Sequence, residues 1–185
     1  MNIYDIGLTI IDEIKAKIPL LKKGFIGQTV VQSDGRIYIL SVPQDQKKGM
    51  ILLDDTHRDH FYIRFDLDKI TYEKLPETII PCQDAYNRSI PARLVFWVYD
   101  IHRFNFIEHM DNILIPLASN LPNHVSLEIQ AVNLDSQNVL SEEKAVEYPK
   151  IGDNLSIIAY DLLITAPFYP QSDVCLSEIP ICKNC

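Results

Sequence analysis

One stretch of the sequence, residues 91–114, holds most of the residue types that could bind a divalent metal. Its candidate ligands are Asp100, His102, Glu108, His109 and Asp111. A metal held by Asp100, His102 and Asp111 could activate water for hydrolysis. No HExxH or other recognised ligand spacing occurs, and His102 and His109 lie on either side of an expected strand-to-helix junction. We interpret these groups as a solvated cap around a helix, where acidic residues near the helix start also complement its dipole.

A second pair of histidines, His57 and His60, lies in the segment THRDH. Their three-residue spacing suits one helical face or a turn. The surrounding chain is polar and resembles a loop, so we expect both side chains on a surface loop.

The cysteines raise a separate possibility at the carboxy terminus. Cys182 and Cys185 form a CxxC pair, and Cys175 lies seven residues upstream. A zinc clip would need these three thiolates and a histidine, and a redox pair would need a strand-to-helix setting that is missing here. We expect a structural tail with incidental thiols, and no disulfide framework, since the sequence shows no secretory signal.

Several enzyme classes lack their usual motifs in this chain. No GxSxG, GxxxxGK[ST] or GxGxxG occurs, and the 6 glycines leave little material for a phosphate-binding loop. We therefore expect neither an acyl-transfer nor a mononucleotide enzyme, and predict that the protein is not an enzyme.

Composition indicates a soluble, unexported protein with one sizeable core. The chain has 185 residues, of which 47% are apolar and 23% charged. No apolar run approaches the roughly 20 residues that cross a bilayer, and the amino terminus is acidic where a signal peptide is basic. The net charge is -8, with scattered Lys and Arg, which argues against a phosphate backbone as the main ligand.

Periodicity predicts two helices. Isoleucines at positions 3, 6, 10, 11, 14 and 18 form one helical stripe that Pro19 closes. A second stripe begins near Asn105, which with Glu108 resembles a capping pair, and contains Phe106, Ile107, Met110, Ile113, Leu114 and Leu117. Pro116 should end or bend this helix near its last turn.

Alternation and apolar runs predict the strands. We expect a hairpin over 25–42, a strand from Phe61 with Tyr62 and Arg64 on a wet face, and a buried strand over 93–99. Two long strands follow, over 124–134 and 154–168. Residues 43–60, 76–91 and 135–153 should be loops, the last with a possible short helix from Ser141.

These elements predict an α+β fold with a mostly antiparallel sheet and two main helices packed on one face. Residues 1–168 form a single domain in this interpretation, with long loops, and residues 169–185 form an irregular tail that contains cysteine and proline.

The order of these elements, with FYIRFDLDKI, RLVFWVYDIHRF leading into NFIEHMDNIL, and IIAYDLLITAPF, resembles the tail terminator and head-to-tail connector proteins of tailed bacteriophages. The resemblance covers roughly residues 1–168 as a pattern. It implies a small α+β subunit that closes into a homo-oligomeric ring at the portal-tail junction of a virion assembled in the host cytoplasm. Adjacent portal, connector or tail proteins would be its partners, and DNA would pass through the lumen without sequence-specific binding.

The resemblance provides no catalytic residue to carry over, and the residues themselves lead us to expect no cofactor and no membrane partner. Residues 43–60 and the cysteine-containing tail depart from the family pattern, and could be arms that reach a neighbouring protein. Two alternatives remain: a small soluble binding module with a zinc clip at Cys175, Cys182 and Cys185, and a metal-dependent hydrolase.

Overall fold

The computed structural model describes residues 3–19, 21, 23–31, 37–41, 50–53, 59–76, 85–99, 103–121, 125–142 and 155–169. Its helices are α1 (Ile3–Lys17), α2 (Arg103–Asn120) and α3 (Ser136–Glu142), with a 3-10 turn η1 (Leu67–Lys69). Its strands are β1 (Lys23–Val31), β2 (Ile37–Ser41), β3 (Met50–Leu53), β4 (His60–Phe65), β5 (Thr71–Lys74), β6 (Tyr86–Tyr99), β7 (Ser126–Asn133) and β8 (Leu155–Phe168). The predicted α+β class with a mostly antiparallel sheet is confirmed.

Two long antiparallel strands, β6 and β8, form the centre of the main sheet. Each has 14 residues, and they pair from Tyr86 with Phe168 to Tyr99 with Leu155. β4 pairs with β6 on one side and β7 pairs with β8 on the other, both antiparallel. β6 is therefore a central strand, paired with β4 on one edge and with β8 on the other. Its side chains are buried on both faces of the sheet, as its apolar sequence predicts.

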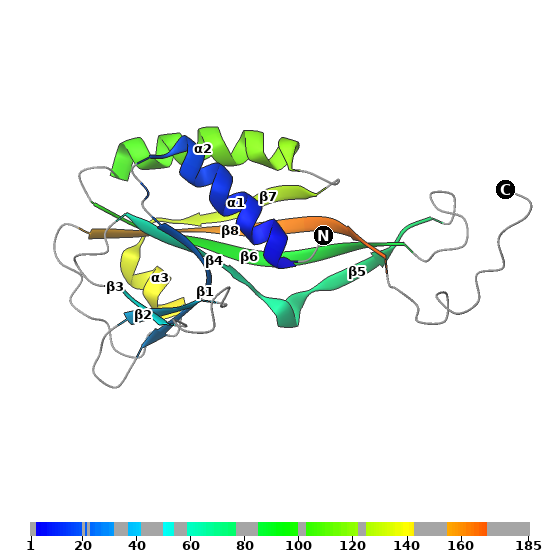
Figure 1. The fold of residues 1–185 in the computed structure, drawn as a ribbon, viewed down its shortest axis with the longest axis horizontal. Helices are drawn as coiled ribbons and strands as arrows, with labels where there is room; N and C mark the ends of the chain where they lie inside the picture. The colour runs from blue at the N-terminus through cyan, green and yellow to red at the C-terminus, as the bar shows by residue number, and fades with distance from the viewer. Residues whose placement is uncertain are drawn as a thin grey trace, which may run out of the picture.

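Strand β1 belongs to two sheets. Its first residues, from Lys23, pair in parallel with β4, and its second half, from Gly27, pairs antiparallel with β2. β2 in turn pairs with β3, so the predicted hairpin is confirmed and extended by one strand. The small sheet lies on the side of the main sheet away from α1 and α2 (Figure 1).

Helices α1 and α2 cover one face of the main sheet and build the larger core (Figure 1). The isoleucine stripe of α1 is buried, with Ile10 and Ile14 fully inaccessible. Met110 and Leu114 of α2 pack into the same core. The two predicted amphipathic helices are confirmed. Each carries an apolar stripe that repeats every three to four residues, and each stripe packs against the sheet.

A smaller core lies on the opposite face, under α3 (Figure 1). Val139 and Leu140 of α3 pack there with side chains from β4, β6 and β8, namely Tyr62, Val95, Trp97, Ile157 and Ala159. The predicted wet face of β4 is therefore wrong at Tyr62, which is 1% exposed, because α3 covers that face. Strand alternation continued from Phe61 would place Leu67 on the buried face, but Leu67 is 61% exposed because β4 ends at Phe65.

The stretch that prompted the metal hypothesis is a strand followed by a helix. β6 begins at Tyr86, inside the predicted loop over 76–91. α2 begins at Arg103, so Asn105 lies inside its first turn and the predicted capping pair is wrong. The helix also continues through Pro116 to Asn120.

Two other predicted loops contain regular structure. The apolar run at 50–53, expected to be irregular, is β3, because its residues pair with β2. A helix does occur within 135–153, but it is α3, which begins at Ser136 and ends one residue after the predicted start at Ser141. The tail beyond Tyr169 lies outside the described residues. No helix among the described residues is long and apolar enough to span a membrane.

Candidate functional site

The structure does not gather the proposed metal ligands that it describes. Glu108, His109 and Asp111 are exposed on α2, while Asp100 and His102 lie outside the described residues. In the described part of the chain, no group of three or more His, Cys, Asp or Glu side chains could hold a metal ion. Cys82, Cys175, Cys182 and Cys185 also lie outside the described residues, so the zinc clip stays a prediction.

His60 differs from the expected surface histidine. It begins β4 and is 3% exposed, because β4 is flanked by β1 and β6 and His60 pairs with Trp97. The Phe25 ring lies 6.0 Å from the His60 ring between centroids. His57 lies outside the described residues, so the predicted surface loop is wrong for His60 and untested for His57.

Asp59, next to His60, has an unusual backbone. Its φ of 66° lies in the left-handed region, where side chains other than glycine are uncommon. Its N–H donates to the Trp97 carbonyl at 2.9 Å, which extends the pairing of β4 with β6 by one hydrogen bond. This bond fixes the start of β4.

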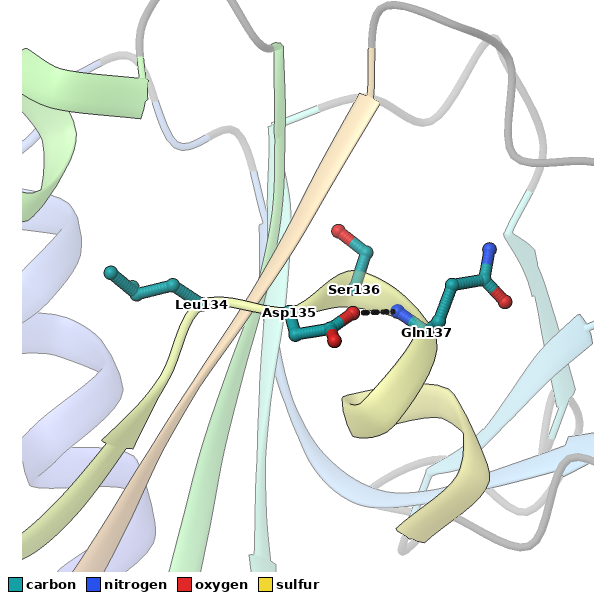
Figure 2. Close-up of a pocket in the computed structure, with 4 residues that line it drawn as sticks. All are labelled: Leu134, Asp135, Ser136 and Gln137. Atoms are coloured by element: carbon teal, nitrogen blue, oxygen red, sulfur yellow. Dashed lines mark hydrogen bonds between the residues drawn. The ribbon is translucent and has the colours of Figure 1, made fainter.

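The corner where β7 enters α3 is a hollowed part of the surface. Leu134, Asp135, Ser136 and Gln137 line an open hollow of about 520 Å³ there (Figure 2). Asp135 caps α3, since its carboxylate accepts hydrogen bonds from the N–H groups of Gln137 (3.0 Å) and Asn138 (3.3 Å). Leu134 points away from α3 in Figure 2 and is 36% exposed.

Both ends of α3 are tied to the sheet. At its start, the Ile157 N–H of β8 donates to the Ser136 hydroxyl at 2.9 Å. At its end, Glu142 accepts a close charged hydrogen bond from Arg93 of β6, and Asp161 of β8 lies 3.1 Å from the same guanidinium. These contacts connect both ends of α3 to the central strands β6 and β8.

The outer edge of the sheet beside this corner is β7. Among the described strands, β7 pairs only with β8, which leaves its other side open. A register shift between Ile129 and Ala131 breaks the expected alternation, so Ala131 is exposed although Val125 and Leu127 are buried. Beyond this irregularity, Val132 is 43% exposed. Apolar side chains and unpaired backbone groups on one edge are the features of a strand-pairing surface.

This surface, β7 with Leu134, was not predicted from the sequence. The segment 124–134 predicts a strand, but its position at the sheet edge depends on pairing with β8, about 30 residues downstream. The available sequence signal for this surface was the pair of apolar residues Val132 and Leu134, just before the polar run DSQN.

Comparison with known proteins assigns no family: no protein-family model matches the chain, and no curated protein sequence matches it.

Proposed function

We propose that this chain is a virion structural protein that forms a homo-oligomeric ring at the portal-tail junction of a tailed phage, as a tail terminator or connector. The proposal extends the sequence resemblance, and the open edge of β7 is the observation that supports it best. The protein would work by contacts with copies of itself and with adjacent portal, connector or tail proteins.

An open strand edge supports assembly for a physical reason. Its backbone N–H and C=O groups can pair with a strand of another chain, and monomeric proteins usually block such edges. Here Val132 and Leu134 are exposed on the edge, instead of the lysines or prolines that would discourage pairing. Pairing would bury apolar surface and complete the hydrogen bonds of the strand.

The face of the sheet away from α1 and α2 has a composition suited to DNA passage. Thr71, Ser89, Thr165 and Ser126 are directly opposite one another on β5, β6, β8 and β7, and form a row of hydroxyl groups across this face. Their neighbours Ile90, Ile164 and Leu127 point into the main core, which places the hydroxyls on the other face. Glu73 and Glu128, two residues along from Thr71 and Ser126, share this face and are exposed. Hydroxyl groups and carboxylates would line a lumen without the tight phosphate binding of a basic wall.

Electron microscopy of the purified chain tests this proposal. We expect closed rings with a central opening, and their loss in Val132→Asp, which places a charge on the β7 edge. Ile115→Asp is the matched control, because Ile115 is an exposed apolar residue (63%) on the outer side of α2. A chain that gives no ring at any concentration, or rings that Val132→Asp leaves intact, would contradict the proposed use of this edge.

A further inference from the structure

We propose that the segment after β8, residues 170–185, docks on its own chain as a strand paired antiparallel with β5. These residues lie outside the described part of the chain, and the surface that would receive them lies within it. Such docking covers an edge that the proposed ring does not use, so it goes beyond that function and does not depend on it.

β5 is an open edge at the end of the main sheet away from α3 (Figure 1). Its four residues, Thr71–Lys74, are all exposed, and β5 pairs only with β6 among the described strands. An edge strand presents unpaired backbone N–H and C=O groups, and proteins commonly cover such an edge with another segment of chain. β5 therefore has hydrogen-bonding groups for one more strand.

An apolar patch lies beside this edge. Leu67, just before β5, is 61% exposed, and Tyr72 is 53% exposed. The Tyr72 ring packs against Phe168, the last residue of β8, with 5.5 Å between ring centroids. Tyr86 of β6 is the register partner of both Phe168 and Lys74, so it lies between β8 and β5 on the same face. Aromatic side chains thus lead from the end of β8 to the β5 edge.

The direction of the chain at this point suits antiparallel pairing. β8 ends at Phe168, and Tyr169, 45% exposed, is the last described residue. β5 and β8 run in the same direction, because each is antiparallel to β6. A chain that leaves β8, crosses β6 and β5 and turns back therefore runs antiparallel to β5, which is the slightly more stable pairing.

The distance to be crossed indicates the register. A strand added to β5 lies three strand spacings from β8, or about 14 Å away. Five residues of extended chain span about 17 Å, so Val174, five residues after Tyr169, can lie opposite Lys74. Such a short connection also holds the segment beside β5 at an effective concentration in the millimolar range. The same chain is therefore favoured over a second copy as the source of the strand.

The sequence of the segment fits this register. Val174 and Leu176 are two residues apart and share one face of an extended chain. Leu176 then lies opposite Tyr72 on the aromatic face, where an apolar cross-strand pair is favourable. On the other face, Cys175 lies opposite Glu73. Pro180 falls beyond the four paired residues, and the added strand is itself an edge, where proline is tolerated.

The charged groups on the two sides do not oppose this pairing. The acids of the segment, Asp173 and Glu178, lie directly before and after the four paired residues, level with apolar residues of the β5 side. The charged residues on the β5 side are Asp66, Asp68, Lys69, Glu73 and Lys74. Lys69 and Asp66 already form an ion pair at 3.2 Å. No acid of the segment lies directly opposite an acid of β5, the arrangement that destabilises a strand pair.

Disulfide cross-linking of the full chain tests the register, because Cys175 is a natural thiol. Glu73→Cys places a second thiol opposite it, within the Cα distance of about 4.4–6.8 Å that a disulfide needs. With oxidised glutathione as the oxidant, we expect the introduced thiol to pair with Cys175 of the same chain, in preference to the other cysteines. Peptide mapping identifies the pair, and denaturing mass spectrometry shows whether one chain or two are joined. Glu128→Cys, on the exposed edge strand β7, is the matched control and should give no predominant disulfide with Cys175.

Amide hydrogen exchange provides a second measurement. Leu176→Asp places a charge opposite Tyr72 and should speed exchange of the outward-facing β5 amides about 10-fold or more. Leu176→Ile should leave this exchange unchanged, as should Ile115→Asp on α2. Docking on the same chain is overturned if the introduced thiol pairs with all cysteines alike, if the disulfide joins two chains, or if Leu176→Asp leaves β5 exchange at the wild-type rate.

Native mass spectrometry separates this result from the proposed function. Leu176→Asp should assemble as wild type does, because it leaves β7 unchanged. Loss of the ring in this variant would place the segment on a neighbouring copy and overturn docking on the same chain. A wild-type chain that is always monomeric would refute the ring function and leave the docking standing.

Discussion

Replacing Tyr160 with phenylalanine should stabilise the protein. Tyr160 lies on β8 in the main core with no exposed surface, and its ring makes an edge contact with Phe96 at 6.0 Å between centroids. Its hydroxyl has no hydrogen-bond partner among the described residues. A buried, unsatisfied hydroxyl costs about 1–3 kcal/mol, so Tyr160→Phe should raise the free energy of unfolding by about 1 kcal/mol at neutral pH after some loss of packing.

The same substitution should remove a pH dependence. Burial, and to a lesser extent the Asp111 carboxylate, raises the pKa of Tyr160 above its ordinary value of 10.0. The folded state therefore favours the neutral phenol, and the unfolded state loses the proton first. Stability is fully present below pH 10 and falls as the pH rises towards the folded-state pKa. Tyr160→Phe should thus gain a further stability advantage of about 1.4 kcal/mol over wild type at pH 11.

Urea unfolding at pH 7 and at pH 11 measures both effects. Tyr4→Phe, at a half-buried tyrosine on α1, is the control for removing a phenol hydroxyl elsewhere in the chain. Tyr160→Phe that destabilises the protein by 1 kcal/mol or more at pH 7 would show that the hydroxyl makes a stabilising contact. An unchanged difference between the two pH values would refute the argument from burial.

Three further substitutions test the packing. Trp97→Ala should lower the free energy of unfolding by about 3–5 kcal/mol in urea titrations, by opening a cavity under α3, and a loss below 1 kcal/mol would contradict its place in the core. Glu142→Gln should speed amide hydrogen exchange in α3 through the weakened contact with Arg93 and leave global stability within about 1 kcal/mol; unchanged exchange would mean that this pair does not hold the helix. Gly24→Ala should cost about 1–3 kcal/mol in thermal unfolding, because its Cβ would lie 2.5 Å from the Phe61 ring, and a neutral effect would show that the ring moves freely.

The parts of the fold that the sequence predicts are those with a local pattern. The isoleucine stripe of α1 repeats within 16 residues, and the apolar runs of β6 and β8 identify central strands. Each pattern indicates that the element is buried against its neighbours in the core, so the local sequence is enough to predict the element.

The parts that it does not predict depend on contacts distant in sequence. Tyr62 alternates with apolar neighbours as a solvent-facing residue would, but α3, more than 70 residues later, covers it. Arg93 and Glu142 are 49 positions apart. The 4 residues of β3 read as an irregular segment until β2 provides a pairing partner.

The candidate assembly surface illustrates the same limit. Strict alternation would place Ala131 on the same buried face as Leu127. The register shift between Ile129 and Ala131 moves Ala131 to the other face, where it is exposed. Whether a strand lies at an edge is a property of the whole sheet, so the open sides of β5 and β7 follow only from the strand order.

Native mass spectrometry of the wild-type chain at several concentrations, with and without a chelator, tests the central claim most directly. The account predicts one closed oligomer whose mass is a fixed multiple of 21.3 kDa and does not change with the chelator. A monomer at every concentration, above all one that carries stoichiometric zinc, would contradict it and favour a metal-binding module built on Cys175, Cys182 and Cys185.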